Sequence, residues 1–406
     1  MRANENALSR LAGFSLCLLL ACVPQADGLV SQSRRRRPSS SGSGSSSSSA
    51  SSSSSRRRGS SSNGVYSSGG SSVAQSSCRD VVATFPSLGQ VNYMKLPHTS
   101  WLPLIESGLT QPEAIVVDDR NNRLYVGDVG TSSLWLYELD VRADCSLALL
   151  GDGSQILSEA TVYSLASDTK GDVYFAGLLS DGTSTDTKRS IYRIAGAAVT
   201  AHLSNGEAVK ATAVWTASNT GSPTALPQPQ GIVVDSFSVF WANSASGSSD
   251  GAVVKASLTA PATNAQDRVR PLADNIDSAW DVVLVPGFAL YSGSGSIYGI
   301  PRDKLGKSCN ASGSCVTITE DVDKVTSMVW IGENDVMMAD SGRGKLSELS
   351  CGSLATHSVR SVADAAGIWS MDVMSWNSAA MDLRFAKSMW LLLVAVWSLG
   401  LCSIST

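Results

Sequence analysis

Histidine and charged residues are scarce in this sequence. The three histidines, His98, His202 and His357, do not stand at metal-ligand spacing from one another or from a pair of cysteines, which argues against a zinc site. Charged residues make up 16% of the chain and aromatic residues 6%, whereas 43% of the residues are apolar. Because so large an apolar fraction can form a core, a fully disordered chain is excluded. From Cys78 onward no segment keeps the 3.6-residue apolar period of a helix, so helices are not expected to build that core.

Long apolar runs occur at the two ends of the chain, and both indicate targeting. Residues 1–28 combine Arg2 and Arg10 with an apolar run over residues 11–23 and a small-residue end, which is the pattern of a signal peptide cleaved after Gly28. The run is too short to span a hydrocarbon core of about 30 Å. We therefore expect a protein that enters the secretory pathway.

Residues 377–406 have the order of a glycosylphosphatidylinositol (GPI) anchor signal. A cluster of small residues is followed by a polar spacer over residues 381–388 and by an apolar tail over residues 389–404. This order predicts that the segment is removed and that a lipid is attached to Ser378 or Asn377, which would hold the protein on the outer surface of the cell. A single membrane helix is the alternative. The short tail, with no Lys or Arg after it, favours the GPI anchor.

Charge is divided unevenly between an arm and a head. Residues 29–77 contain seven Arg and no acid, and 25 of the residues between 31 and 77 are Ser. Residues 78–378 carry 20 basic and 32 acidic side chains, a net charge of -12. We expect the arm to be a disordered, solvated tether, and the signal peptide directs it away from nucleic acid. Its arginines could also bind the acidic head or anionic partners at the cell surface.

The head, residues 78–376, is built from repeats. Short stretches of alternating apolar and polar residues recur between turn residues, which indicates an all-β domain. The segment Pro112–Asp118 recurs almost residue for residue at residues 229–235. First strands of successive units begin near Pro112, Val162, Pro229, Ala279 and Val325, at intervals of 50, 67, 50 and 46 residues, and a lone strand follows Gly367. Three further strands precede the first unit. The sequence therefore predicts a six-bladed β-propeller whose last blade joins three N-terminal strands to one C-terminal strand.

The repeated motif also carries a resemblance to known families. It reads Pro-x-(Gly/Ala)-Ile-Val-Val-Asp and is followed by a strand that ends in Asp or Asn, as at Asp128, Asn243 and Asp340. It resembles the six-bladed NHL, low-density-lipoprotein-receptor YWTD and senescence-marker/gluconolactonase propellers over nearly all of residues 78–376. The YWTD resemblance implies that these three side chains accept hydrogen bonds from backbone N–H groups and lock blade to blade. Such propellers include enzymes, receptors and scaffolds, so the motif is specific for the fold rather than for a function.

First strands point side chains into the central funnel, which is the candidate site. Glu113 resembles the metal-binding glutamate of gluconolactonase-like enzymes, and Asp281 is a second candidate ligand for a calcium-type ion. Comparable places on other first strands are held by Tyr163, Gln230, Ser327 and Ser370. Trp280 and Trp369 also fall on strands and are interpreted as packing between blades.

Besides a purely structural coat protein, two functions are compatible with such a funnel. The first is a monomeric module at the cell surface that recognises a protein, a glycan or a small molecule. The alternative is a metal-dependent lactonase or esterase, in which the cation would polarise the substrate carbonyl and activate water. Calcium is thus a possible cofactor of the second function, while the first needs an exposed and complementary surface.

Five cysteines remain once both ends of the chain are removed, so one should be unpaired or form an intermolecular bond. Cys78 should lie near either Cys145 or Cys351. We expect the bond from Cys78 to Cys351, because it would staple the ring closure across 272 residues.

A second disulfide is expected within one loop. Cys309 and Cys315 flank a short polar segment and are close enough in sequence to pair. That segment contains Asn310-Ala-Ser, the one N-glycosylation sequon of the chain, in a place where a loop can carry a glycan.

Overall fold

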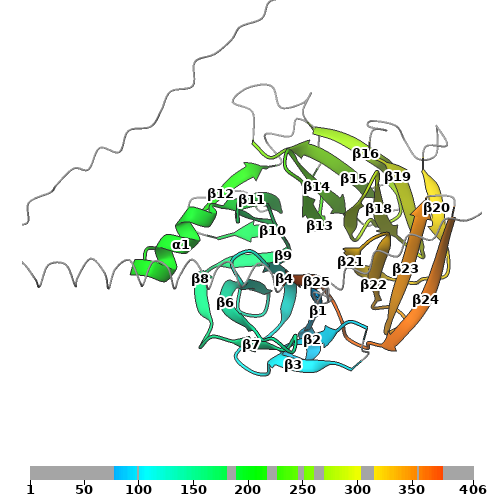
Figure 1. The fold of residues 1–406 in the computed structure, drawn as a ribbon. Helices are drawn as coiled ribbons and strands as arrows, with labels where there is room; N and C mark the ends of the chain where they lie inside the picture. Colours follow the sequence, from blue (N-terminus) through cyan, green and yellow to red (C-terminus); the bar gives the residue numbers. More distant parts are fainter. Residues whose placement is uncertain are drawn as a thin grey trace, which may run out of the picture. The chain divides into compact units, whose positions relative to one another are not determined.

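The head is a ring of six antiparallel sheets, or blades, around a central axis (Figure 1). The computed structural model describes residues 77–97, 100–180, 189–216, 226–245, 251–259, 269–302, 315–353 and 356–377. The predicted all-β six-bladed propeller is confirmed. None of the helices in these residues is long and apolar enough to cross a membrane.

Blades 1 to 5 have their first four strands in sequence order from the axis outward. Blade 1 consists of β4 (Pro112–Asp118), β5 (Arg123–Asp128), β6 (Ser133–Val141) and β7 (Leu147–Leu149), with β8 (Ser154–Leu157) also paired to β6. Blade 2 consists of β9 (Ala160–Ser167), β10 (Val173–Leu179), β11 (Ser190–Ile194) and β12 (Ala211–Trp215). Blade 3 consists of β13 (Pro229–Val234), β14 (Ser238–Asn243), β15 (Gly251–Ser257) and β16 (Val269–Ile276).

The second half of the ring repeats this order. Blade 4 consists of β17 (Val282–Val285), β18 (Phe288–Gly293), β19 (Ser296–Pro301) and β20 (Val316–Thr319). Blade 5 consists of β21 (Val325–Gly332), β22 (Asp335–Asp340), β23 (Lys345–Ser353) and β24 (Thr356–Asp364). Blade 6 has the order β25 (Met371–Asn377), β1 (Ser77–Phe85), β2 (Gln90–Lys95) and β3 (Leu102–Ile105).

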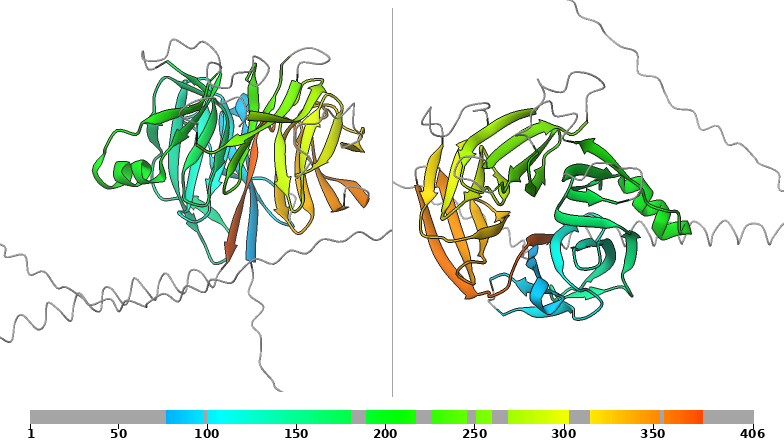
Figure 2. Two further views of the ribbon diagram at one scale, coloured as in Figure 1. Left: turned by 90° about the horizontal axis from the view of Figure 1, so that it is seen from above. Right: turned by 180° about the vertical axis from the view of Figure 1, so that it is seen from behind.

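The sixth blade closes the ring as predicted. β25 pairs with β1 from Ser77 opposite Asn377 to Ala83 opposite Met371. The start of β1 and the end of β25 therefore lie side by side on one face of the ring, where Figure 2 shows them reaching the same level. Closure removes the unpaired edge that either strand would otherwise present to solvent.

The core lies between blades. Six clusters of buried apolar side chains each join two neighbouring blades around the ring. Trp215 and Trp241, both fully buried, lie in the cluster between blades 2 and 3. Because each blade is buried on both faces, its middle strands are almost continuously apolar, as Val239, Phe240 and Trp241 show in β14.

One helix was not expected from the sequence. The helix α1 (Gly196–Asn205) connects β11 to β12 and buries only Gly196 and Val199. The backbone N–H of Gly196 donates to the Asp172 carboxylate at 2.9 Å, so the acceptor at the start of the helix comes from a residue 24 positions earlier. A contact between residues so far apart in sequence cannot be predicted from a short stretch of the chain.

The expected pairing of Cys78 with Cys351 is wrong. Cys78 is bonded to Cys145, the other neighbour considered, and Cys351 is a buried free thiol. The reason is the alternation of β1: Val82 packs in the cluster shared with blade 1, so Cys78, an even number of residues away, faces blade 1 too. Cys351 packs between blades 4 and 5 instead.

Other predictions concern residues at the limit of the structure or beyond it. Cys315 is disulfide-bonded, while its expected partner Cys309 and the sequon residue Asn310 lie outside the described residues. The signal peptide, the arm and Ser378 also lie outside them, and Asn377 is the last residue of β25.

Candidate functional site

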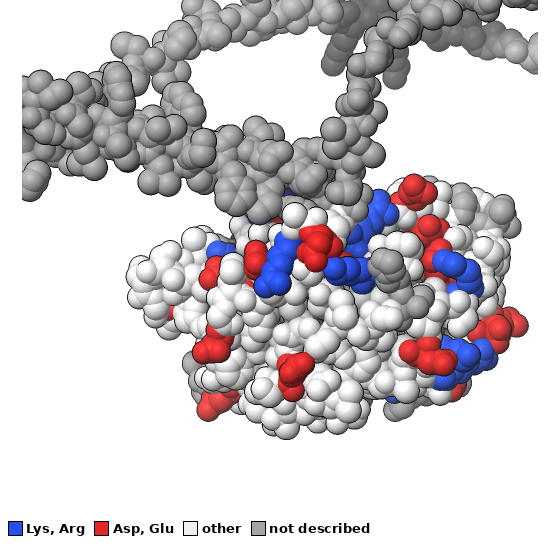
Figure 3. Space-filling view, turned by 60° about the horizontal axis from the view of Figure 1, so that its bottom comes forward, with Lys and Arg blue, Asp and Glu red and all other residues white. Residues whose placement is uncertain are grey.

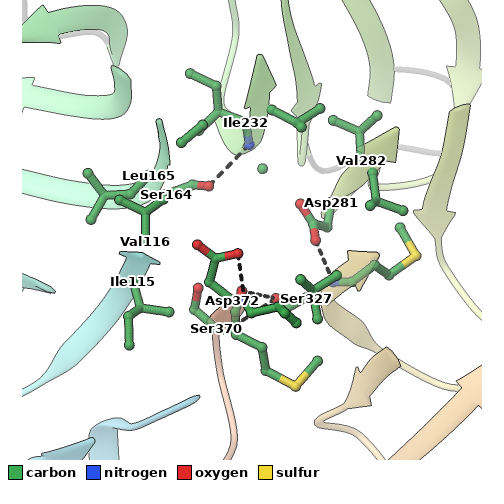
Figure 4. A pocket seen from close by; sticks show the side chains of 18 of the residues that line it. Ile115, Val116, Ser164, Leu165, Ile232, Asp281, Val282, Ser327, Ser370 and Asp372 are labelled. Carbon is green, nitrogen blue, oxygen red and sulfur yellow. Dashed lines mark hydrogen bonds between the residues drawn. The ribbon is translucent and has the colours of Figure 1, made fainter. Parts of the chain in front are cut away.

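The first strands of the six blades surround a cavity of about 330 Å³ (Figure 4). It is lined by residues of β4, β9, β13, β17, β21 and β25 and of the segments that enter them. All six strands run in the same direction, so their first residues form one end of this cavity.

A β-bulge marks this end in four blades. The strand register passes over Glu113 in β4, Tyr163 in β9, Gln230 in β13 and Thr326 in β21, so each is an extra residue without an opposite partner. A bulge bends its strand and re-aims the extra side chain, here toward the cavity that all four line. Trp280 and Trp369 hold the corresponding positions before β17 and β25. The mouth ring is defined as these six residues: Glu113, Tyr163, Gln230, Trp280, Thr326 and Trp369.

Arg189 lies over the mouth ring between blades 2 and 3. Its guanidinium carbon is 3.5 Å from the centre of the Tyr163 ring, and its Nη1 donates to Gln230 Oε1 at 2.6 Å. Stacking on an aromatic face and a hydrogen bond to an amide together restrict the side chain to one orientation.

Lys324 occupies the other side of the mouth ring. Its Nζ is 4.0 Å from the centre of the Trp280 ring and 4.7 Å from that of Trp369. Burial lowers the pKa of this ammonium, and the charges of Glu113 and Asp323 act in the opposite direction. The two tryptophans, half-buried and interpreted from the sequence as packing, thus hold a cation at the mouth.

Glu113 is the carboxylate of the mouth ring. Gln111 Nε2 donates to its Oε1 at 2.5 Å. Burial raises the pKa of the Glu113 carboxyl, although this hydrogen bond and the charges of Arg189 and Lys324 act to lower it. The charges of both cations therefore act on the pKa of this one carboxyl group.

A second layer of polar side chains lies one residue deeper and joins neighbouring blades. Met328 N donates to Asp281 Oδ2 at 2.6 Å, Met371 N to Ser327 Oγ at 2.9 Å, and Ile232 N to Ser164 Oγ at 3.1 Å. Ser370 is fixed differently, since its N–H donates to Thr84 Oγ1 of the adjacent strand at 3.1 Å. The predicted funnel residues Asp281, Ser327 and Ser370 therefore belong to this layer, whereas Glu113 and Gln230 belong to the mouth ring.

Two carboxyl groups point toward the centre of the cavity (Figure 4). Burial raises the pKa of Asp281 and of Asp372 to about 7, against the lowering effect of backbone N–H donors at each. For Asp372 these donors are Val117 N of blade 1 and Val373 N. The same carboxylate therefore fixes the last strand of the ring to the first blade.

The proposed calcium ligands Glu113 and Asp281 both line the cavity, but each is held by other groups. Asp281 is committed to Met328 N and Val282 N, while Glu113 lies in the mouth ring with Gln111. Among the described residues no group of three or more His, Cys, Asp or Glu could hold a metal ion. Calcium takes six to eight oxygen ligands, so this donor set does not fit it.

The motif residues Asp128 and Asp340 fix the backbone segments that lead into the mouth ring. Asp340 accepts hydrogen bonds from Asp323 N and Lys324 N at 2.9 and 3.0 Å, and Asp128 accepts from Gln111 N at 2.7 Å. The resemblance implied bonds that lock blade to blade. These bonds instead fix the segment that enters the same blade, and with it the backbone of Lys324 and the residue that binds Glu113.

Sequence reasoning missed the two cations. Arg189 and Lys324 lie outside the repeated motif, and nothing in their immediate sequence shows that aromatic rings lie beneath them. One signal was available: the residue before the Gly/Ala of the motif is Glu113 in blade 1 and Gln230 in blade 3, polar at a position that begins an inner strand. The residues at this position of the repeat belong to the mouth ring.

No protein-family model and no curated protein matches this chain. Solved structures do. The nidogen/laminin complex has a chain that is 10% identical, with a TM-score of 0.52, and the match covers 74% of this chain and 98% of that one. The periplasmic gluconolactonase PpgL of Pseudomonas aeruginosa is 14% identical, with a TM-score of 0.42 and coverage of 73% and 99%. At 10% identity the likeness to the chain of the nidogen/laminin complex is one of fold alone.

Proposed function

We propose that this protein is a recognition module displayed on the cell surface, which binds its ligand at the mouth ring. The observation that carries the proposal is the pair of cations, Arg189 and Lys324, each held over aromatic side chains of the mouth ring, at the end of a cavity with a mixed polar and apolar lining. Concave sites with a few convergent polar groups are the usual form of a ligand site.

The use of the funnel carboxylates favours binding over metal-assisted hydrolysis. A lactonase or esterase of that class needs several oxygen ligands that converge on one cation. Asp281 and Asp372 accept hydrogen bonds from backbone N–H groups, which leaves Glu113 as the one carboxylate of the mouth ring. Metal-assisted hydrolysis is therefore the alternative function, which the binding experiment below also tests.

The direction of β25 supports display away from a membrane. Its seven residues run from the mouth to the opposite face, a rise of roughly 20 Å. A lipid attached at Asn377 or Ser378 would therefore leave from the face opposite the mouth ring, and the arm before Ser77 would start beside it. This geometry would keep the mouth accessible on an anchored protein.

Anchoring is tested on cells that express the full chain. Phosphatidylinositol-specific phospholipase C should release the protein into the medium, and replacing both Asn377 and Ser378 with leucine should prevent attachment. Protein that stays on the membrane until detergent is added would favour the single membrane helix instead.

Binding is tested with a panel of monosaccharides, uronates, amino acids and short peptides, read as shifts in the melting temperature of the full chain. Gln230→Trp should fill the mouth and abolish any shift. Thr317→Trp, on the exposed side of β20, should keep it. A shift that survives Gln230→Trp would place the site elsewhere, and calcium-dependent hydrolysis of lactones or esters would establish the alternative function.

A further inference from the structure

We propose that the mouth ring binds a small organic anion, with the carboxylate of the ligand placed between Arg189 and Lys324. The inference rests on the proposed function and names the chemical class of its ligand. It follows from the charges at the mouth, from the donors that remain there, and from the size of the cavity below.

The charge at the mouth is opposite to that of the head. Residues 78–378 carry a net charge of -12, yet the mouth has two cations against the single carboxylate of Glu113. Asp323 also influences Lys324, but this residue is exposed and its carboxylate lies against Gly342. An acidic head repels anions at long range, so a local excess of positive charge indicates recognition of a particular anion rather than general attraction.

Several basic side chains elsewhere on the head are paired with acids. Arg193 pairs with Asp172 and Arg302 with Asp235, and on the face in Figure 3 the basic groups lie beside acidic ones on a largely uncharged surface. Within the described ranges, neither Arg189 nor Lys324 has a salt-bridge partner. Aromatic rings take the place of the acid in both cases.

Hydrogen-bond donors remain at both cations. Arg189 uses Nη1 on Gln230, while its Nε and Nη2 meet no acceptor in the part of the chain that the structure describes. Lys324 Nζ likewise donates to none of the described residues. Both side chains are half-buried, so these donors remain open to a ligand that enters the mouth. A planar carboxylate matches the two free donors of a guanidinium, and a second oxyanion contact suits the ammonium.

The mouth is fixed before a ligand arrives. Tyr163, Trp280 and Trp369 hold the two cations in place, and Asp340 fixes the backbone of Lys324. A site ordered in advance loses less side-chain entropy on binding. The volume below, about 330 Å³, is at the lower end of small-molecule pockets and suits a single sugar or organic acid rather than a polymer.

The test is calorimetric titration of the full chain with galacturonate and with galactose, two sugars that differ by the carboxylate. Galacturonate should bind at least about tenfold more tightly. Lys324→Met should weaken galacturonate binding by a similar factor, and Lys324→Arg should retain most of it. Glu113→Gln, which removes the one opposing charge, should strengthen binding severalfold.

Lys255→Met is the matched control, because Lys255 also lies over an aromatic ring, 5.0 Å from the centre of Phe240, but on β15 away from the mouth. It should leave binding unchanged. Equal binding of galactose would overturn the anion proposal while a mouth site still stands. Weaker binding by Glu113→Gln would also overturn it, since Glu113 would then contact the ligand or a cation. If inorganic phosphate bound more tightly than galacturonate, the group recognised at the mouth would be a phosphate rather than a carboxylate. Galacturonate binding that is unchanged in Gln230→Trp would refute the mouth site itself.

Discussion

Asp281 is a carboxyl group whose environment makes its charge costly. The residue is 8% exposed, and burial outweighs two backbone N–H donors in setting its pKa to about 7, compared with 3.8 in the unfolded chain. The folded protein therefore holds this proton more tightly than the unfolded chain does. Stability from this group is complete below about pH 4 and is lost as the pH rises through about 7. Asp372 acts in the same direction.

Asp281→Asn should flatten the pH dependence of stability. The amide can still accept from Met328 N, but it cannot become charged. We expect the melting temperature of the wild type to fall between pH 5 and 8 and that of the variant to fall less, with roughly 4 kcal/mol as the upper limit of the difference in unfolding free energy. Thermal unfolding across that range measures it, with Asp364→Asn, whose side chain is 94% exposed, as control. Identical slopes for variant and wild type would contradict the assignment.

Single residues were predictable where the repeat fixed their place. Glu113 and Gln230 stand in one column of the motif, so the sequence alone puts them at the start of inner strands. Arg189 and Lys324 could not be found this way, because their position depends on rings contributed by other strands and other blades. The bulge that turns these side chains toward the cavity could not be predicted from the sequence either, since it is a property of strand pairing.

At the scale of strands and helices, the alternation of β1 decides which cysteines meet. The sequence placed Cys78 near two candidates, and the packing of Val82, an even number of residues along β1, shows that Cys78 faces blade 1. The helix α1 was missed for a related reason, since the acceptor at its first turn is Asp172 in another element. Strand order, by contrast, followed from turn residues and alternation because each hairpin is local.

Loss of the disulfide should cost considerable stability. Replacing both Cys78 and Cys145 with serine releases a loop with a sequence separation of 67 residues, which corresponds to about 4 kcal/mol in the chain-entropy description. Urea unfolding measures the change. Cys351→Ala should cost far less, because it removes one small buried side chain and no cross-link. An equal loss in both proteins would mean that the cross-link adds nothing beyond side-chain packing.

On the scale of the whole molecule, closure depends on one strand. β25 supplies the inner strand of blade 6, accepts the bond from Val117 N through Asp372, and donates to Ser327 through Met371 N. Blades 1, 5 and 6 are thus joined by seven residues. The sequence predicted this closure by counting strands, since five units with three strands left over and one lone strand leave no other complete ring.

A chain that ends before Met371 should not form the ring. Removing β25 exposes the edge of β1 and unbinds two neighbouring blades, so we expect aggregation or loss of cooperative unfolding. A chain that ends at Asn377 should unfold cooperatively, because every strand of the ring is present. Circular dichroism and size-exclusion chromatography distinguish the two results. A monomer lacking β25 with an unchanged melting temperature would contradict the role given to this strand.

The pairing of Ser77 with Asn377 also decides how the head responds to pulling. A load applied between the arm and the C-terminal end acts on two strand ends that lie opposite each other, so backbone bonds would open one after another rather than all together. The second pair to open contains Cys78, and there the disulfide passes the load to the loop between β6 and β7 of blade 1. β1 then stays in place while β25 peels away, so the ring opens like a zipper at low force and its other five blades remain intact.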